Sequence, residues 1–248
     1  MLPDATRILP SQETAQQLNE QFAAHDTLTF LNRILTVEQG LGRITVVSSF
    51  GVESAVLLHL VSCVRPDTAV TFLDTGFHFE ETIEYRDELV ARLNLTDVRS
   101  ARVDPLAEKR LDEQRWLHRI DPDRCCQLRK VEVLSRALRG FGGWVSGQKR
   151  FQSAQRQLIE RVEFDAERSK FKFNPLADWR AEDIENYFVA HDLPRHPLLA
   201  EGFRSIGCGP CTTAAGENEH ARAGRWRGSD KIECGLHRPG HLIAVSVA

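Results

Sequence analysis

Strand-like segments alternate with helix-like segments along the first half of the chain, and this order constrains the fold more than any other feature. The segments are a β-branched strand at 44–47, a polar turn at 48–54, an apolar helix at 55–64, a strand at 69–73, a turn at 74–76 and an amphipathic helix at 80–93. Strands that alternate with helices predict an α/β fold with a mostly parallel sheet covered by helices on both faces. Ligands of such sheets bind beyond the carboxyl ends of the strands, where both turns lie.

The rest of the chain adds helices, strands and a polar end. Residues 1–40 are typical of polar helices, and Asp121 followed by Pro122 predicts the start of a helix that ends near Gly140. A strand at 144–146, a short aromatic segment at 171–173 and a helix at 181–191 follow. From about residue 217 the sequence is polar and rich in arginine and glycine. We expect one domain, 1–248, whose residues 217–248 form a mobile C-terminal tail.

Composition narrows the class of protein. Hydrophobic residues make up 42% of the 248 residues and charged residues 27%, which is typical of a soluble globular protein. Apolar runs are shorter than the roughly 20 residues that a membrane helix needs, and the N-terminus lacks the pattern of a secretory signal. We therefore expect a cytoplasmic protein. A net charge of −3 argues against general nucleic-acid binding.

Four of the six cysteines form two tight pairs, Cys125-Cys126 and Cys208-Gly209-Pro210-Cys211. Cysteines of a reducing compartment more often bind metals or catalyse reactions than form disulfides. Four thiolates suit zinc or an iron–sulfur cluster. Adjacent residues of a helix point about 100° apart, so adjacent sulfurs converge poorly on one ion and favour the cluster. A zinc site and incidental core cysteines remain alternatives. Cys63 lies in an apolar helix, and we expect it in the core.

The remaining cysteine, Cys234, lies in Glu233-Cys234-Gly235-Leu236-His237 within the polar tail. An exposed thiol near Lys231 and His237 can ionise, and only the thiolate attacks electrophiles. Cys234 is therefore a candidate nucleophile. A spare surface cysteine and a fifth metal ligand are the alternatives.

The turn at 48–54 and several basic residues are candidate anion-binding elements. Gly51 permits close approach of a phosphate to a helix N-terminus, but a simple capping turn has the same pattern. Arginine binds phosphate or sulfate bidentately, although a single arginine is more often only a solvated charge. Lys130 follows Cys126 by four residues, so on a helix it shares a face with that cysteine. The basic candidates are Lys130, Lys149, Arg150, Arg156, Arg222 and Arg225.

Together these motifs resemble the sulfonucleotide reductase family, specifically its cluster-bearing assimilatory adenylyl-sulfate reductases. The similarity extends from about Thr45 to His237, and the two cysteine pairs with the terminal Glu-Cys-Gly-Leu-His are its most specific part. The turn at 48–54 is also similar to the phosphate loop of ATP-pyrophosphatase-like adenine nucleotide folds. One departure is Ala154-Gln155 before Arg156, where many relatives have Pro-Thr. Residues 74–76, 124–130 and 146–153 also resemble the corresponding segments of this family.

The resemblance implies an adenine nucleotide alpha hydrolase-like fold and a set of site residues. It implies a [4Fe–4S] cluster on Cys125, Cys126, Cys208 and Cys211, and Cys234 as the nucleophile. Reduced thioredoxin or a similar dithiol would be the partner, with neither nucleic acid nor a membrane involved and the oligomeric state open. The implied substrate contacts are Ser48, Ser49, Gly51, Glu53, Leu73, Lys130, Gly147, Arg150, Arg156, Arg222 and Arg225.

The implied reaction is thioredoxin-dependent reduction of adenosine 5′-phosphosulfate to sulfite and AMP through an S-sulfocysteine, in sulfate assimilation. One alternative is a phosphoadenylyl-sulfate reductase, although relatives specialised for that substrate usually lack the paired cysteines. A second is an RNA-thiolating, adenylating enzyme with an iron–sulfur cluster, which the net charge and the terminal motif disfavour. A zinc module without catalysis is the third, and the colour of the purified protein distinguishes it.

Overall fold

A six-stranded sheet forms the centre of the computed structural model, which describes residues 8–36 and 40–237. The strand order is β3-β2-β1-β4-β6-β5; β5 pairs antiparallel with β6, and all other pairs are parallel. The predicted α/β fold with a mostly parallel sheet is confirmed. The strands are β1 (Ile44–Ser48), β2 (Val70–Asp74), β3 (Val98–Arg102), β4 (Gly143–Val145), β5 (Val162–Asp165) and β6 (Lys170–Phe173).

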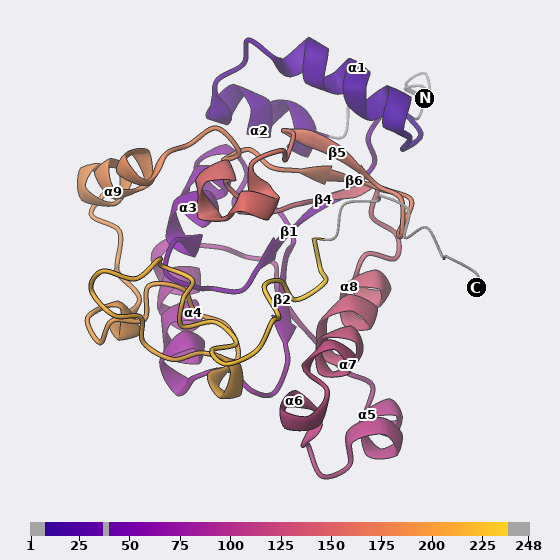
Figure 1. Ribbon diagram of the computed structural model, residues 1–248. Coiled ribbons are helices and arrows are strands. Elements are labelled where there is room, and N and C mark those ends of the chain that lie inside the picture. Colours follow the sequence, from indigo (N-terminus) through magenta and orange to yellow (C-terminus); the bar gives the residue numbers. More distant parts are fainter. Residues whose placement is uncertain (1–7, 37–39, 238–248) are drawn as a thin grey trace.

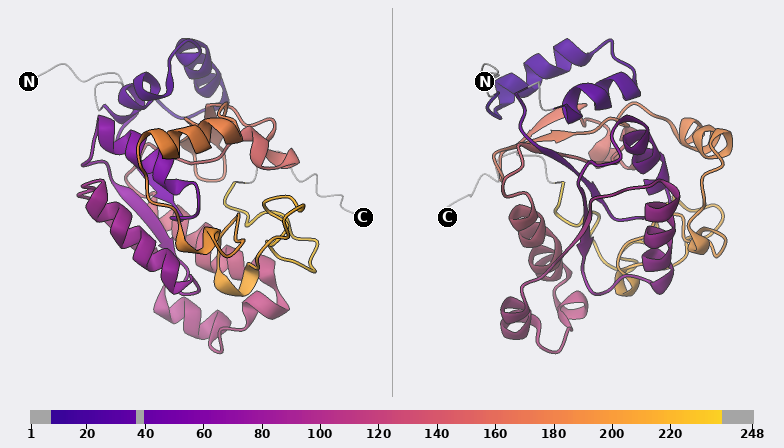
Figure 2. Two further views of the ribbon diagram at one scale, coloured as in Figure 1. Left: turned by 90° about the vertical axis from the view of Figure 1, so that its left-hand side faces the viewer. Right: turned by 180° about the vertical axis from the view of Figure 1, so that it is seen from behind.

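Helices cover both faces of this sheet, as Figures 1 and 2 show. On one side lie α3 (Ser54–Val64), α4 (Glu80–Arg92) and α9 (Ala181–Ala190), and on the other lie the helices between β3 and β4. The latter are α5 (Pro105–Asp112), α6 (Leu117–Ile120), α7 (Pro122–Cys126) and α8 (Glu132–Ala137). The N-terminal helices α1 (Gln12–Phe22) and α2 (Thr27–Leu35) pack near the β5 edge of the sheet.

The degree of burial explains why some strands can be recognised in the sequence and others cannot. Every residue of β2 is buried, because helices cover both faces of a central parallel strand. The strand therefore appears as a continuous apolar run. The edge strand β3 has only partly buried or exposed side chains and contains two arginines, a composition that protects an edge from pairing with other chains. The sequence gives little sign of β3 for this reason.

The helix predicted after Asp121 forms, with a change of geometry in its middle. The Asp121 carboxylate accepts a hydrogen bond from the Arg124 N–H at 2.9 Å, which confirms the predicted N-cap. After α7 the backbone makes one π-helical turn, Gln127–Val131, before α8 continues. A π turn inserts an extra residue into a helix, and such turns are frequent at functional sites. Both Cys126 and Lys130 flank or lie in this turn.

The structure corrects the expected burial of Cys63 and describes only part of the predicted tail. Cys63 was expected in the core, but it is exposed. It lies one turn after His59 near the C-terminal end of α3, and its sulfur is 3.7 Å from His59 Nε2. Of the predicted mobile tail 217–248, residues 238–248 lie outside the described residues, as do 1–7 of the predicted N-terminal helical region.

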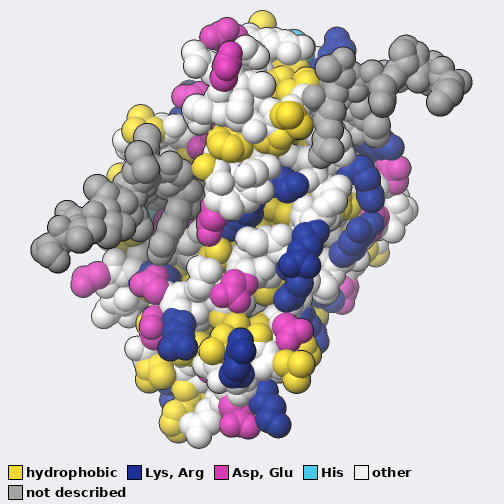
Figure 3. All heavy atoms as spheres, turned by 90° about the vertical axis from the view of Figure 1, so that its right-hand side faces the viewer, with side chains coloured by type: hydrophobic (Ala, Val, Ile, Leu, Met, Phe, Trp, Pro, Cys, Tyr) yellow, Lys and Arg dark blue, Asp and Glu magenta, His cyan; other side chains and the backbone are white. Residues whose placement is uncertain are grey.

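The surface on the α5–α8 side is mixed in character. In Figure 3 basic, acidic and apolar side chains are interspersed on this face. Among residues 8–36 and 40–237, no helix has the length and apolar character needed to cross a bilayer.

Candidate active site

A cavity of about 440 Å³ opens at the carboxyl ends of β1 and β4. From β1 the sheet continues through β2 and β3 in one direction and through β4, β6 and β5 in the other. The strand order therefore reverses between β1 and β4. Loops diverge at such a point and leave a crevice for a ligand. The cavity wall includes the turn after β1, the loop after β4 and the C-terminal residues 233–237.

The turn after β1 presents the start of α3 to the cavity. Phe50 has a φ of 49°, and its N–H donates to Ser48 Oγ at 3.1 Å, which closes a tight turn. The N-cap residue Glu53 makes no side-chain capping bond. The Ser54 N–H donates to the Gly51 carbonyl at 2.9 Å. The start of α3 lies on the cavity wall, where the positive end of the helix dipole attracts an anion.

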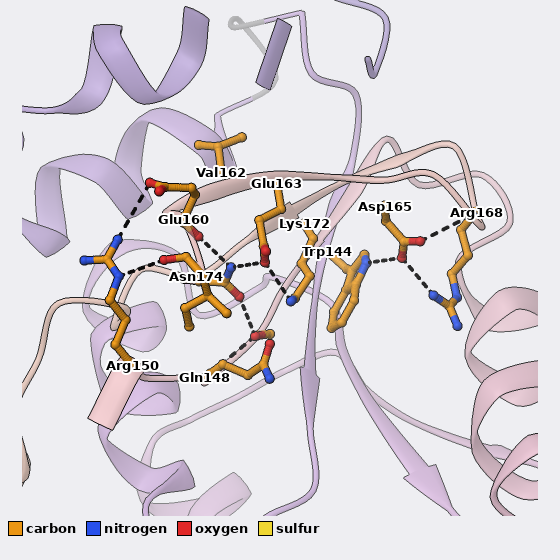
Figure 4. Close-up of polar contacts among 12 residues, drawn as sticks. Trp144, Gln148, Arg150, Glu160, Val162, Glu163, Asp165, Arg168, Lys172 and Asn174 are labelled. Carbon is orange, nitrogen blue, oxygen red and sulfur yellow. Dashed lines mark hydrogen bonds and ion pairs between the residues drawn. The ribbon is translucent and has the colours of Figure 1, made fainter. Parts of the chain in front are cut away.

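A buried polar network fixes the loop after β4, as Figure 4 shows. The Gln148 N–H donates to Ser146 Oγ at 3.3 Å, and the Ser146 hydroxyl donates to Asn174 Oδ1 at 2.7 Å. Asn174 Nδ2 in turn donates to Glu163 Oε2 at 2.6 Å, and Lys172 Nζ pairs with the same oxygen at 2.7 Å. Gln148 Oε1 is buried without a partner, but the other bonds connect the loop to β6 and β5. Such connected networks are rigid, so Gly147 is held in place at the cavity wall.

The four paired cysteines surround a second, small cavity next to the first. They are Cys125, Cys126, Cys208 and Cys211, and we call them the cysteine group. Burial raises the pKa of the Cys125 thiol to about 12 and of the Cys126 thiol to about 11, with neighbouring thiols contributing. Within the described parts of the chain, no three Cys, His, Asp or Glu side chains converge closely enough to hold a single metal ion.

Lys130 lies between the cysteine group and the larger cavity. Burial lowers its pKa, but the neighbouring sulfurs of Cys208, Cys234 and Cys126 raise it by more, so the net pKa is raised. For the Cys208 thiol, burial raises the pKa, and the charge of Lys130 with a hydrogen bond from Thr75 lowers it by more. Lys130 is therefore a cation adjacent both to the cysteine group and to Cys234.

Arg225 is a second cation on the cavity wall. Its guanidinium lies over Gly207 and over the Trp226 ring, 4.5 Å from the ring centroid. Its Nε is buried without a hydrogen-bond partner. Within residues 8–36 and 40–237, neither Arg225 nor Lys130 forms an ion pair with a carboxylate. A buried donor without a partner is costly, so Arg225 favours an anionic ligand. Lys130, which hydrogen-bonds to Cys208, adds positive charge to the same cavity.

The C-terminal segment passes over the cavity with Cys234 on its wall. Glu233 pairs with Arg156 at 2.8 Å and with Arg222 at 3.3 Å. Burial lowers the pKa of Arg222 to about 10, although the charge of Glu233 opposes this change. His237 stacks on the buried Trp144 ring, with ring centroids 5.5 Å apart, and burial lowers its pKa well below the usual value.

The structure brings all but one of the predicted substrate contacts to the larger cavity. Arg150 is the exception, because its guanidinium pairs with Asp178 and Glu160 outside the cavity (Figure 4 shows Arg150 and Glu160). The preceding residue, Lys149, has an extended backbone, and neighbouring side chains of an extended segment point in opposite directions. Only one of the two can therefore face the cavity. The residues present are Ser48, Ser49, Gly51, Glu53, Leu73, Lys130, Gly147, Arg156, Arg222 and Arg225.

From the sequence, Lys149 is only a basic candidate and not an implied substrate contact, and Gln152 is not indicated. Lys149 Nζ pairs with Glu53 at 2.7 Å, and Gln152 Nε2 donates to the same carboxylate at 2.6 Å. Both line the cavity. The alternation of side chains along an extended segment would have shown that only one of Lys149 and Arg150 faces the cavity.

Comparison with known proteins gives a consistent result. The family described as "Phosphoadenosine phosphosulfate reductase domain" matches residues 43–214. A Mesorhizobium japonicum protein named adenosine 5′-phosphosulfate reductase is 44% identical over 205 residues, which cover 83% of this chain and 80% of the relative. A Gloeobacter violaceus protein named phosphoadenosine 5′-phosphosulfate reductase is 42% identical over 200 residues, covering 79% of this chain and 82% of the relative.

Solved structures share the fold. The phosphoadenylyl-sulfate reductase of Candida auris, in a phosphate complex, superposes with a TM-score of 0.68 at 24% identity. The alignment covers 82% of this chain and 98% of that one. The FMN adenylyltransferase of Candida glabrata with FMN and an ATP analogue gives a TM-score of 0.51 at 15% identity, covering 82% of this chain and 73% of that one. At these identities the similarity concerns the fold alone.

Proposed function

The chain belongs to the phosphoadenosine phosphosulfate reductase domain family, that of the sulfonucleotide reductases, and from this premise we propose that it reduces adenosine 5′-phosphosulfate to sulfite and AMP. The electron donor in this proposal is reduced thioredoxin or a similar dithiol, in the cytoplasm, as a step of sulfate assimilation. Three relatives that are 43–45% identical to this chain are named adenosine 5′-phosphosulfate reductase.

One observation carries the proposal: two cations without carboxylate partners lie in the same cavity as a thiol. Lys130 and Arg225 line the cavity with Cys234, and neither forms an ion pair among the described residues. A thiolate and a phosphosulfate are both anions, so their approach requires positive charge nearby. Prepositioned cations supply it without the cost of reorganising water.

The chemistry assigned to Cys234 consists of two displacements. Its thiolate attacks the sulfur of the phosphosulfate; a new S–S bond forms, the S–O bond to the phosphate breaks, and AMP leaves with the electron pair. An S-sulfocysteine remains on the protein. A thiolate of thioredoxin then attacks the Cys234 sulfur and displaces sulfite, and a second thioredoxin thiol resolves the mixed disulfide and regenerates the Cys234 thiolate. Both electrons come from the dithiol.

The nucleotide itself would lie between the turn after β1 and the loop after β4. Ser48, Ser49 and Gly51 would contact the phosphate at the start of α3. Gly147 and Leu73 would contact the nucleoside at the carboxyl ends of β4 and β2. This placement follows the lining of the cavity and the rule that ligands bind at the reversal of strand order.

We include a [4Fe–4S] cluster held by the cysteine group in the proposal. Zinc–sulfur bonds of about 2.3 Å require four thiolate sulfurs within about 4 Å of one another. The four thiols surround one small cavity, and a [4Fe–4S] cluster takes one thiolate at each of its four bridged irons. When bound, the cluster would link α7 to the turn at 208–211 and act electrostatically beside Lys130.

Mass spectrometry tests the function. Wild-type protein given adenosine 5′-phosphosulfate without thioredoxin should gain one SO₃ group, and peptide mapping should place it on Cys234. Thioredoxin should then release sulfite. Cys234→Ser should bind substrate and form neither adduct nor sulfite, because a hydroxyl is far less ionised than a thiol. An adduct on another cysteine, or sulfite release by Cys234→Ser, contradicts the mechanism.

The Gloeobacter relative gives a specific reason to keep a second candidate substrate, the 3′-phosphorylated sulfonucleotide. The same assay with both nucleotides separates the two. We expect a higher kcat/KM for the unphosphorylated substrate. Equal or higher kcat/KM for the 3′-phosphorylated one would make this chain a phosphoadenosine 5′-phosphosulfate reductase instead.

A further inference from the structure

The Glu233 carboxylate is bound by two arginines directly beside Cys234. Arg156 Nε donates to Oε1 at 2.8 Å and Arg156 Nη2 donates to Oε2 at 3.1 Å, so the arginine contacts the carboxylate through two parallel bonds. Arg222 Nη2 lies 3.3 Å from Oε2 and also donates to the Ile232 carbonyl at 2.9 Å. The side chains of Arg156, Arg222 and Glu233 are only 11%, 16% and 21% exposed. Such partly desolvated, bidentate pairs are stronger than exposed ones.

Arg156 belongs to the fixed wall of the cavity. It ends a short 3₁₀ turn after β4, and its remaining amino group donates to Gln152 Oε1. Gln152 donates in turn to Glu53 at the start of α3. A continuous polar chain therefore connects the Arg156 guanidinium to the turn that follows β1.

Arg222 belongs to a region that is also anchored. Thr212 and Arg225 form an isolated antiparallel bridge, the Thr213 N–H donates to the Gly224 carbonyl at 2.9 Å, and the Trp226 N–H donates to the Cys211 carbonyl at 3.0 Å. Gly224 lies so close to this strand that an added Cβ would be 1.9 Å from the Thr213 oxygen. These contacts hold the chain beside the cysteine group up to Trp226.

Glu233 lies on the segment that follows this anchor, residues 227–237, which we call the terminal segment. Gly228 and Gly235 both have left-handed backbones, with φ of 82° and 84°, and an added Cβ at Gly228 would meet no atom within 4 Å. Glycine adopts this conformation without strain, so these two positions let the chain turn on either side of Glu233. The pairs with Arg156 and Arg222 then connect the terminal segment to two anchored walls.

These contacts divide the basic residues of the cavity into two sets. The Arg156 N–H groups that could bind a phosphate or sulfate bidentately are already occupied by a carboxylate of the same geometry. An external anion cannot use them while Glu233 stays in place. Lys130 and Arg225 carry no such carboxylate among the described residues.

We propose that Arg156 and Glu233 are positioning residues: their ion pair, shared with Arg222, holds the terminal segment closed and seats Cys234 at the cavity. Arg156 then acts on the reaction through the tail rather than by contacting the nucleotide. This inference rests on the proposed role of Cys234 as the nucleophile, and it reassigns Arg156 from the predicted substrate contacts.

Alkylation of Cys234 in the full-length protein tests the inference without requiring any reductase activity. Glu233→Gln and Arg156→Gln should each raise the rate of Cys234 modification by iodoacetamide about tenfold, measured by peptide mapping, because the segment opens more often. The two changes have opposite electrostatic effects on the thiolate, since one removes a negative and the other a positive charge. An increase in both therefore reports opening and not a changed pKa.

Glu185→Gln is the matched control. It removes an ion pair of similar length, 2.5 Å to Arg195, that lies outside both the cavity and the terminal segment. Its alkylation rate should stay within twofold of wild type. The double variant Arg156→Gln/Glu233→Gln should alkylate no faster than the quicker single variant, because both changes break one contact.

Nucleotide binding separates the two possible roles of Arg156. In a Cys234→Ser background, Arg156→Gln should change the Kd for adenosine 5′-phosphosulfate by less than about twofold, while in the Cys234 protein it should lower kcat. A tenfold weaker Kd with an unchanged alkylation rate would overturn the inference and make Arg156 a substrate ligand. Faster alkylation in both variants, with no sulfite from wild type, would instead uphold the closure and reject the proposed reductase function.

Discussion

Gly207→Ala should displace the Arg225 guanidinium without replacing the nucleophile or any member of the cysteine group. A Cβ added at position 207 would lie 2.2 Å from Arg225 Nη2 and 2.4 Å from Cζ, far inside van der Waals contact. Gly207 has no left-handed backbone conformation that alanine would strain. The substitution therefore acts on the arginine side chain, which is the flexible partner in this contact.

The size of the effect follows from what Arg225 is proposed to do. A hydrogen bond to a charged group contributes about 1.5–3 kcal/mol, which corresponds to a factor of about 10 to 100 in rate at about 1.4 kcal/mol per tenfold change. We expect kcat/KM for sulfite release to fall by that factor in Gly207→Ala. Arg225→Ala should show a similar loss, and the double variant should be no worse than Arg225→Ala alone.

The assay is thioredoxin-dependent sulfite release, accompanied by iron and sulfide analysis to show that any cluster content matches wild type. Gly216→Ala is the matched control, because an added Cβ there would lie 3.5 Å from the Glu219 side chain, an ordinary contact outside the cavity. Two results would refute the idea that Gly207 leaves room for the Arg225 guanidinium. One is a wild-type kcat/KM in Gly207→Ala, and the other is a double variant far slower than Arg225→Ala.

Two further predictions concern the cysteine group and acid stability. Wild-type protein purified without oxygen should be brown and contain about four irons and four sulfides per chain, the composition of a [4Fe–4S] cluster. Cys126→Ser should lose both the colour and the activity. A colourless wild-type protein with one zinc would exclude the cluster. Burial lowers the pKa of His196 to about 4, and its ring accepts from the Leu198 N–H and contacts Thr82 Oγ1 at 3.0 Å. Because the unfolded chain takes up this proton near pH 6.5 and the folded chain does not, about 3 kcal/mol of stability present above pH 6.5 should be lost as the pH falls to 4. Urea unfolding at several pH values should show a flatter pH dependence in His196→Gln; equal slopes in the two proteins would argue against this linkage.

The central part of the fold could be predicted from the sequence because its elements are buried on both sides. The strands β1 and β2 and the helix α3 appear as apolar runs, and their observed bounds differ from the predicted ones by one residue at each end or less. The edge strands β3 and β5 were not predicted. Three of the four residues of β5 are half-buried and two are acidic. Glu163 and Asp165 take part in side-chain pairs that only the folded chain creates.

The site could be predicted as a set of residue types but not as a set of contacts. The sequence places Arg150 and Arg156 in the same loop, and nothing in their spacing shows that Arg150 turns toward Asp178 while Arg156 meets Glu233. Both partners are distant along the chain, 28 and 77 residues away. Long-range pairs of this kind depend on the register of the sheet and the path of the tail, which local patterns do not contain.

The π turn after Cys126 explains how neighbouring residues of one helix serve different surroundings. Arg129 points into the protein, where it pairs with Asp112 at 2.8 Å and with Glu108 at 2.7 Å and donates to the Thr75 carbonyl at 3.1 Å. Lys130, the next residue, lines both the cavity and the cysteine group. The two cations are adjacent in the sequence but differ in their partners. Carboxylates neutralise Arg129, whereas Lys130 forms no ion pair among the described residues and can bind an anion. In a regular helix, a spacing of four residues predicts that Cys126 and Lys130 share a face. The two residues do line the same small cavity, but the backbone between them is a π turn and not a regular α-helix.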